Sequence, residues 1–235
     1  MGSRRADDRT WVALISMLVA ALLAPLLPTV GMPVGAQEPT GTDGEAVQVQ
    51  RVGGATRIET AVATSQRFFD EAEHVVLARA GDFPDALAAG PLARSVRGPI
   101  LLTRSGALPT VVEAEFTRLG AGRLTIAGGT DAVSDAVAEQ VRSLGIAVDR
   151  IGGADRYATA RLIADRVGFD DGVANLARGS SNADGDGFAD ALTAGTFGLT
   201  GQQVPTLLTG RDVLPEPTAA VLAGAENVEV TLIGG

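Results

Sequence analysis

The sequence contains no cysteine and no lysine, and it has a single histidine among its 235 residues. Without cysteine the chain can form neither a disulfide framework nor a thiol nucleophile, so packing and hydrogen bonding must supply its stability. All 19 basic residues are arginine, and 28 acidic residues bring the formal net charge to −9. No basic patch dominates this balance, which argues against a nucleic-acid partner.

The residues needed for common hydrolytic chemistry are scarce. A catalytic metal requires a set of histidine and carboxylate ligands, and covalent catalysis requires a nucleophile with a base. His74 stands alone at the start of an apolar run, and neither Gly-x-Ser-x-Gly nor His-Glu-x-x-His occurs. Dinucleotide and P-loop fingerprints are also missing. We therefore expect no catalytic residue, no metal and no cofactor in this chain.

Residues 1–36 have the pattern of an export signal. Arginines near the start precede an almost uninterrupted apolar run, Trp11–Leu27, and small residues then offer a cleavage site before Gln37. An uncleaved anchor helix is the alternative, but Pro25 falls within a run that is barely long enough to span a bilayer. Cleavage would leave an exported protein with no stable membrane insertion.

The segment 37–50 is rich in Glu, Thr, Gly and Gln and has no apolar period. Such a composition is typical of a flexible linker. The ordered part of the chain is therefore expected to begin near Arg51.

The remainder of the chain contains an internal repeat, which determines the fold prediction. The first motifs recur 99 residues later (51 to 150), and the later motifs recur at 105 and then 106, so the second copy contains an insertion. The matching pairs are Arg51–Ala61 with Arg150–Ala160, Ala78–Arg79 with Ala177–Arg178, Phe83–Gly90 with Phe188–Gly195, Leu101–Thr103 with Leu207–Thr209, and Ile126–Gly129 with Leu232–Gly235.

Each copy alternates short β-branched runs with alanine-rich amphipathic stretches, a pattern that predicts an α/β fold with parallel sheets flanked by helices. Runs that are apolar on both faces suit strands covered on each side. In the first copy we expect helices near 57–69, 84–96, 109–119 and 131–144, and strands at 74–78, 99–103, 123–127 and 147–151.

These boundaries predict two modules, 51–149 and 150–235. The second module lacks a counterpart of residues 130–149 and is therefore incomplete. Either the chain is a fragment of a longer product, or another chain completes the second module, because a sheet face without its helix exposes apolar area.

The opening Arg-Val/Ile-Gly-Gly-Ala-x-Arg, the block Gly81–Gly90 and the closing Ile-x-Gly-Gly together resemble the cell wall-binding repeat 2 family, over residues 51–235. The resemblance implies an exported Gram-positive surface protein whose tandem Rossmann-like modules bind an anionic secondary wall polymer without catalysis. In such proteins three modules usually associate around a pseudo-threefold axis. This chain departs from that pattern, so a third repeat or self-association is an expected partner.

Such repeats commonly accompany an effector such as an amidase, a protease or an S-layer segment. The alternative function is therefore the targeting part of a wall hydrolase whose catalytic domain is not in this chain. A third hypothesis is a receptor for a small molecule or sugar phosphate with a Rossmann-like pocket.

The leading ligand candidates are Arg57 and Arg156, which occupy the same place in both modules, together with Tyr157. A guanidinium group suits bidentate recognition of phosphate or carboxylate. An ion pair with the module's own Asp85 or Asp190 is an equally weighted alternative.

Carboxylates flank the start of one helix in each module, Asp82 and Asp85 in the first and Asp186 and Asp190 in the second. They are candidates for ligand contact, although capping of a helix N-terminus explains them as well.

Two short glycine-containing segments offer weaker signals. The glycine pairs at 53–54 and 152–153 could cradle an anion with backbone N–H groups or simply form tight turns. The insertion Asn182–Gly187 resembles a calcium loop, but Thr193 stands where the loop needs a bidentate glutamate. A solvated polar loop is therefore expected there.

The charge balance restricts how an anionic polymer could be bound. Removal of residues 1–36 deletes three arginines and two aspartates, which changes the net charge from −9 to −10. Long-range attraction then cannot drive binding, so recognition would depend on local arginine clusters, directed hydrogen bonds or bridging divalent cations.

Overall fold

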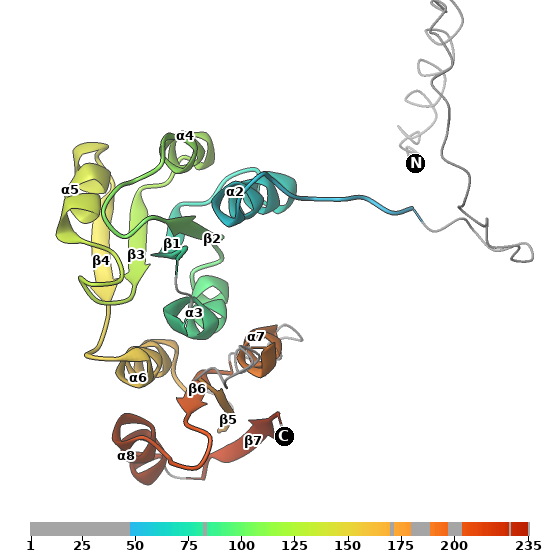
Figure 1. Ribbon diagram of the computed structural model, residues 1–235, viewed down its shortest axis with the longest axis vertical. Helices are drawn as coiled ribbons and strands as arrows, with labels where there is room; N and C mark the ends of the chain where they lie inside the picture. The colour runs from blue at the N-terminus through green and yellow to red at the C-terminus, as the bar shows by residue number, and fades with distance from the viewer. Residues whose placement is uncertain are drawn as a thin grey trace, which may run out of the picture. The chain divides into compact units, whose positions relative to one another are not determined.

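The computed structural model describes residues 48–81, 84–169, 172–179, 189–196, 204–225 and 227–234 (Figure 1). The expected signal peptide, most of the linker, Asp82, Asp186 and the 182–187 insertion lie outside the described residues. All described helices and strands belong to one compact unit, Val49–Gly235. Within the described residues, no helix is both long and apolar enough to cross a membrane.

The first repeat contains four helix and strand pairs, and all the expected elements are present. Its elements are α2 (Arg57–Phe68), β1 (His74–Arg79), α3 (Pro84–Ser95), β2 (Ile100–Thr103), α4 (Thr110–Leu119), β3 (Arg123–Ala127), α5 (Asp135–Ser143) and β4 (Ala147–Ile151).

One boundary differs from the expectation, because α5 begins at Asp135 and not near residue 131. Ser134 caps this helix: its backbone is extended and its hydroxyl accepts a hydrogen bond from the N–H of Val137. The four residues before it form a turn in which the N–H groups of Ala132 and Val133 both donate to Gly129 O.

The second repeat has the same element order up to its third strand. Its described elements are α6 (Arg156–Val167), β5 (Val173–Arg178), α7 (Ala189–Thr196), β6 (Thr206–Thr209), α8 (Glu216–Gly224) and β7 (Glu229–Ile233).

Each repeat builds a parallel sheet, as predicted. The first has the strand order β2-β1-β3-β4, and the second has β6-β5-β7, so its described part is one strand smaller. The two sheets share one register: Val76 pairs with Ile100 in the first, and Asn175 pairs with Thr206 at the equivalent place in the second. The strand β4 differs from the expected buried strands, because it lies at the sheet edge and alternates exposed and covered residues.

The two repeats pack through helices that lie between their sheets (Figure 1). One apolar cluster contains side chains of α3 from the first repeat and of α6 and α7 from the second. The helices α3 and α7 approach so closely that a Cβ atom added to Gly90 would lie 3.0 Å from the carbonyl oxygen of Gly195. These two glycines are equivalent residues of the two repeats.

Candidate functional site

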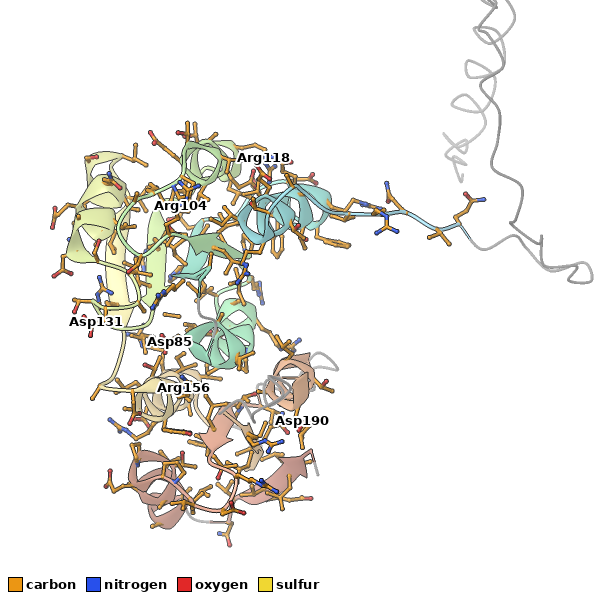
Figure 2. All side chains as sticks on the ribbon, in the orientation of Figure 1. Asp85, Arg104, Arg118, Asp131, Arg156 and Asp190 are labelled. Atoms are coloured by element: carbon orange, nitrogen blue, oxygen red, sulfur yellow. The ribbon has the colours of Figure 1, made fainter. Side chains whose placement is uncertain are left out.

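The carboxyl ends of the strands in the first sheet form the candidate site. The chain order reverses there, because β2 lies on one side of β1 and β3 on the other. In open parallel sheets, ligands bind in the crevice outside the strand ends at such a switch point. Two hollows open at this edge. Asp85, Asp131 and Arg156, which are labelled in Figure 2, line one of them.

The first hollow, which we call the arginine hollow, has a volume of about 610 Å³. It lies between the start of α2 and the ends of β1 and β2. Arg57, Arg79 and Arg104 line it, and no carboxylate is among its described lining residues. In a chain of net charge −9, this hollow is a local concentration of positive charge.

Arg57 and Arg156 perform the same structural task in the two repeats. The Nη1 atom of Arg57 donates to Ala80 O at 2.7 Å, and the Nη1 atom of Arg156 donates to Gly179 O at 2.7 Å. Each bond ties the start of a helix to the end of the next strand. The two leading candidates from the sequence therefore contact the strand ends, and each uses at least one N–H for the fold.

The glycine pairs are also engaged by the fold. Gly54 N donates to the hydroxyl of Thr60 at 3.0 Å, and Gly153 N donates to the hydroxyl of Thr159 at 3.1 Å. A Cβ atom added to either glycine would lie 2.4 Å from the Cβ of the residue five positions later. Close packing against the helix start therefore explains the second glycine of each pair, which favours the tight-turn interpretation.

Two arginines that the sequence analysis did not select have greater freedom to bind. Arg79 ends β1 and Arg104 follows β2, and neither side chain makes a hydrogen bond or ion pair with any described residue. The signal in the sequence was the recurrence of Ala78-Arg79 as Ala177-Arg178. Arg178 ends β5 at the equivalent place in the second repeat.

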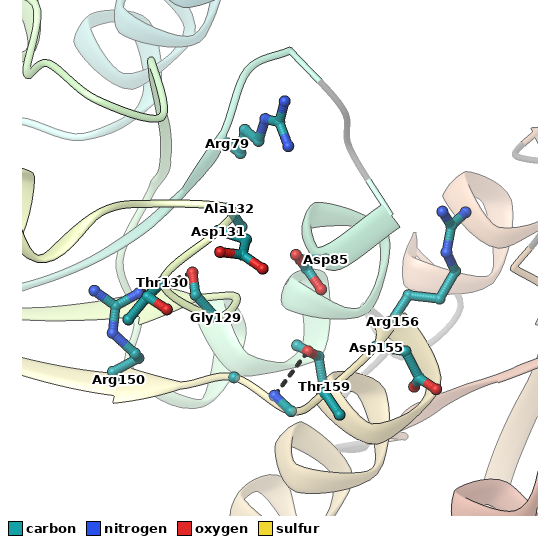
Figure 3. A pocket seen from close by; sticks show the side chains of 13 residues that line it. Arg79, Asp85, Gly129, Thr130, Asp131, Ala132, Arg150, Asp155, Arg156 and Thr159 are labelled. Atoms are coloured by element: carbon teal, nitrogen blue, oxygen red, sulfur yellow. Dashed lines mark hydrogen bonds between the residues drawn. The ribbon is translucent and has the colours of Figure 1, made fainter.

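The second hollow, the junction hollow, has a volume of about 500 Å³ and takes its lining from both repeats (Figure 3). Asp85 at the start of α3 and Asp131 in the loop after β3 point toward each other across it. The second repeat contributes the segment Gly152–Arg156 and Thr159. Arg79 lines both hollows.

Arg150 lines the junction hollow, but both of its terminal nitrogens are bound by the fold. Its Nη1 atom donates to the carbonyl oxygens of Gly128 at 3.1 Å, Gly129 at 3.0 Å and Val133 at 2.8 Å. Its Nη2 atom lies 3.2 Å from the carboxylate of Asp135. This arginine therefore holds the loop between β3 and α5 in place.

Asp85 and Asp190 lie against the closing glycine of their own repeats. Gly128 and Gly234 have positive φ values of 123° and 119°. A Cβ atom added to Gly128 would lie 2.8 Å from Oδ2 of Asp85, and one added to Gly234 would lie 2.3 Å from Oδ2 of Asp190. The two carboxylates thus occupy equivalent places at the strand ends, next to the helix starts.

The remaining sequence candidates contribute less to this geometry. Tyr157 is half-buried and packs against the apolar cluster between the repeats. Asp82 and Asp186 belong to the part of the chain that the structure does not describe. Among the described residues, no group of three or more His, Asp or Glu side chains could hold a metal ion.

His74 lies at the opposite end of β1, away from both hollows. Its Nε2 atom is 2.8 Å from the hydroxyl of Thr125. Burial lowers the pKa of His74 below its usual value, and the charges of Arg123 and Arg166 lower it further. A neutral imidazole paired with a hydroxyl on the next strand fits a structural role.

With this geometry in place, comparison with known proteins identifies the family. The model of cell wall binding domain 2 matches residues 51–138 and 150–235. The chain belongs to the cell wall binding domain 2 family. The match covers both repeats, so each repeat corresponds to one domain of this family.

Two curated relatives from Bacillus subtilis share both repeats. The chain is 30% identical over 187 residues to the N-acetylmuramoyl-L-alanine amidase LytC, covering 80% of this chain and 36% of LytC. It is 31% identical over 197 residues to the amidase enhancer, covering 82% of this chain and 26% of the enhancer. The chain therefore spans about a third of the length of LytC and about a quarter of the length of the amidase enhancer.

Two solved structures have the same arrangement of repeats. Cwp8 from Clostridium difficile matches with a TM-score of 0.69 and 30% identity, over 82% of this chain and 32% of that protein. Cwp6 from the same organism matches with a TM-score of 0.68 and 28% identity, over 84% of this chain and 32% of that protein. These neighbours support the α/β repeat fold and a location at the cell wall or cell surface.

Proposed function

We propose that the chain is a non-catalytic module that anchors an exported protein to an anionic secondary polymer of the Gram-positive cell wall. The observation that carries the proposal is the arginine hollow, where Arg79 and Arg104 make no polar contact with the described residues. Guanidinium groups are planar forks of N–H donors that match phosphate and carboxylate oxygens.

The position of the arginines explains how a chain with a negative net charge could bind an anionic polymer. Electrostatic interactions at physiological salt fade beyond about 8 Å. A bound anion therefore responds to Arg57, Arg79 and Arg104, which line its hollow, and much less to the total charge of −9. Binding driven by such local contacts should weaken as salt is added.

The second repeat offers a related set of groups. Arg156 and Arg178 stand at the equivalent strand end, and Arg211 follows β6 with an exposed side chain. Two linked sites of modest affinity bind a repetitive polymer more tightly than either site alone, because the second contact becomes intramolecular. Within this scheme Asp85 and Asp190 position the strand ends or contact polymer hydroxyls.

Substitution of the unpaired arginines tests the proposal. We expect Arg79→Gln with Arg104→Gln to weaken binding to purified walls by about tenfold or more, because each charge-assisted contact contributes about 1.5 to 3 kcal/mol. Co-sedimentation with walls, before and after extraction of the secondary polymer, measures the effect.

Arg142→Gln is the matched control, because Arg142 is exposed on α5 and pairs with Glu139 far from the hollow. It should bind walls like the unchanged chain. Equal binding to extracted and intact walls, or full binding by the double variant, would contradict polymer recognition at this site.

The relatives support a second candidate, the targeting part of a wall hydrolase. LytC is an amidase by name, and this chain covers 36% of it. An assay of muropeptide release by the natural full-length product distinguishes the two roles, since a targeting module acts only when joined to a catalytic domain.

We further propose that another repeat of the same kind packs on α7. Equivalent residues of the two repeats differ in exposure, because α6 and α7 both pack on α3, while no such pair of helices packs on α7 within the described residues. Leu87 on α3 is 2% exposed, whereas its counterpart Leu192 on α7 is 59% exposed. At the other end, Val167 on α6 is 6% exposed and its counterpart Phe68 on α2 is 69% exposed.

A further inference from the structure

The junction hollow carries charges of both signs, unlike the arginine hollow beside it. We infer that it is a subsite for an ammonium group that stands next to a phosphate or carboxylate, as in an amino-sugar phosphate. This inference rests on the proposed polymer binding and adds a chemical requirement to it. Asp131 and Asp85 would receive the ammonium group, and Arg79 would hold the neighbouring anion.

The two carboxylates are placed to receive a cation. Asp85 projects from the start of α3 and Asp131 from the loop after β3, and they face each other across the hollow (Figure 3). The side chain of Asp131 makes no hydrogen bond or ion pair with any described residue. An ammonium group has three N–H donors, so it can contact both carboxylates at once.

The other charged groups of the lining are committed to the fold. Arg150 donates to three carbonyl oxygens, as described above, and Asp155 caps α6 by accepting from Ala158 N at 2.8 Å. Asp131 and Arg79 are therefore the charged groups of the lining that have no polar partner among the described residues. Because Arg79 also lines the arginine hollow, one anion can contact both hollows.

The remaining surface suits a sugar ring. Gly129, Gly152 and Gly153 form part of the lining, so backbone groups approach the hollow without side chains in between. The hydroxyl of Thr159 faces the same space. A volume of about 500 Å³ lies within the usual range of small-molecule sites, about 300 to 1,000 Å³.

The hollow requires both repeats. Asp85 and residues 129–132 come from the first repeat, and the segment Gly152–Arg156 with Thr159 comes from the second. The subsite is therefore a property of the junction and not of an isolated repeat. Its ligand would be bound where the polymer passes from one repeat to the next.

A matched pair of probes tests the inference. Glucosamine 6-phosphate and glucose 6-phosphate differ by one ammonium group. By isothermal titration calorimetry with the full chain, we expect the amino sugar to bind about tenfold more tightly, as one charge-assisted contact predicts. Asp131→Asn should reduce this preference to near unity and leave the affinity for glucose 6-phosphate within about twofold. Arg79→Gln should weaken the binding of both sugars.

Glu71→Gln is the control, because it removes the same charge at an exposed residue outside both hollows. It should retain the preference for the amino sugar. Equal affinities for the two sugars, a preference that survives Asp131→Asn, or no binding of either sugar by a chain that binds walls would overturn the inference. A chain that prefers the amino sugar but ignores walls would instead overturn the proposed function.

Discussion

At the scale of single residues, equivalent glycines of the two repeats have different surroundings. Gly53 and Gly152 are each the first glycine of the repeated pair. A Cβ atom added to Gly53 meets nothing within 4 Å, whereas one added to Gly152 would lie 2.4 Å from the carbonyl carbon of Gly128. Gly152 is thus required by the contact with the end of β3.

We therefore predict that Gly152→Ala destabilises the chain by about 2 to 3 kcal/mol, because neither backbone can move without disturbing a sheet. Gly53→Ala should leave stability unchanged or raise it by up to about 1 kcal/mol through the unfolded state. Urea unfolding followed by circular dichroism compares the two. Equal losses of unfolding free energy in both variants would show that the contact between Gly152 and Gly128 does not contribute to stability.

The sequence pointed to two of the arginines at this edge of the sheet but not to Arg79 and Arg104. Arg57 and Arg156 drew attention because they follow the glycine pairs, yet each donates to a carbonyl of the next strand. Arg79 and Arg104 have no such partner among the described residues. Which guanidinium meets a carbonyl depends on loop conformation in three dimensions, and a sequence repeat does not contain that information.

At the scale of elements, a buried carboxylate joins α4 to α2 in the first repeat. Glu115 is 1% exposed and accepts from Arg118 Nη2 at 2.7 Å and from Gln66 Nε2 at 3.3 Å. Arg118 also donates to the carbonyl oxygens of Phe69 and Asp70, just after α2 ends. Figure 2 shows Arg118 where α4 approaches α2.

This network predicts a pH dependence of stability. Burial is the largest influence on the pKa of Glu115 and raises it, but the hydrogen bonds that the carboxylate accepts and the positive charge of Arg118 together outweigh burial, so the pKa lies below its usual value. The unfolded carboxylate binds a proton near pH 4.3 while the folded one stays charged, so stability falls as the pH drops below about 4.3.

We expect Glu115→Gln to lower the free energy of unfolding by about 2 kcal/mol at pH 7, because the donors lose a charged acceptor. The free energy of unfolding of the variant should also fall less steeply at acid pH than that of the unchanged chain. The control is Asp165→Asn, which breaks the exposed pair with Arg161 on α6 and should change stability by less than about 1 kcal/mol. Urea titrations between pH 3 and 7 test both expectations. If the unfolding free energies of Glu115→Gln and of the unchanged chain fell in parallel with pH, Glu115 would not be the source of the acid dependence.

The elements themselves were predictable because their apolar periods are clear. Every expected helix and strand of the first repeat is present, with bounds that agree within a few residues. The start of α5 was placed too early, since the cap at Ser134 competes with a longer helix. The strand order, with β4 at the edge, was not predicted from the sequence, because it is set by packing between distant segments.

At the scale of the whole molecule, the repeats form one compact unit with exposed apolar residues at both ends of their stacking. Leu192 and Leu232 of the second repeat are 59% and 73% exposed. Their counterparts Leu87 and Ile126 are 2% and 0% exposed. The sequence shows no counterpart of residues 130–149 after the second repeat, but which residues are exposed follows only from the packing of the helices.

We predict that copies of the chain associate weakly through α7 of one and α2 of another. Leu192→Asp should weaken this association about tenfold, because a charge in an apolar contact must be desolvated. Sedimentation velocity over a range of concentrations measures it. Val213→Asp adds the same charge at another exposed site and should have no effect. A chain that stays monomeric throughout, or equal effects of both variants, would contradict the prediction.

The crossing of α3 and α7 at Gly90 and Gly195 has a consequence for how such arrays can diversify. Both sides of this contact are the same motif position, so a larger residue introduced before a duplication would arrive on both helices together. Neither copy could then make room for the other. The residue at this position must therefore stay small in every copy that packs against another, even where a lone repeat would tolerate a bulkier side chain.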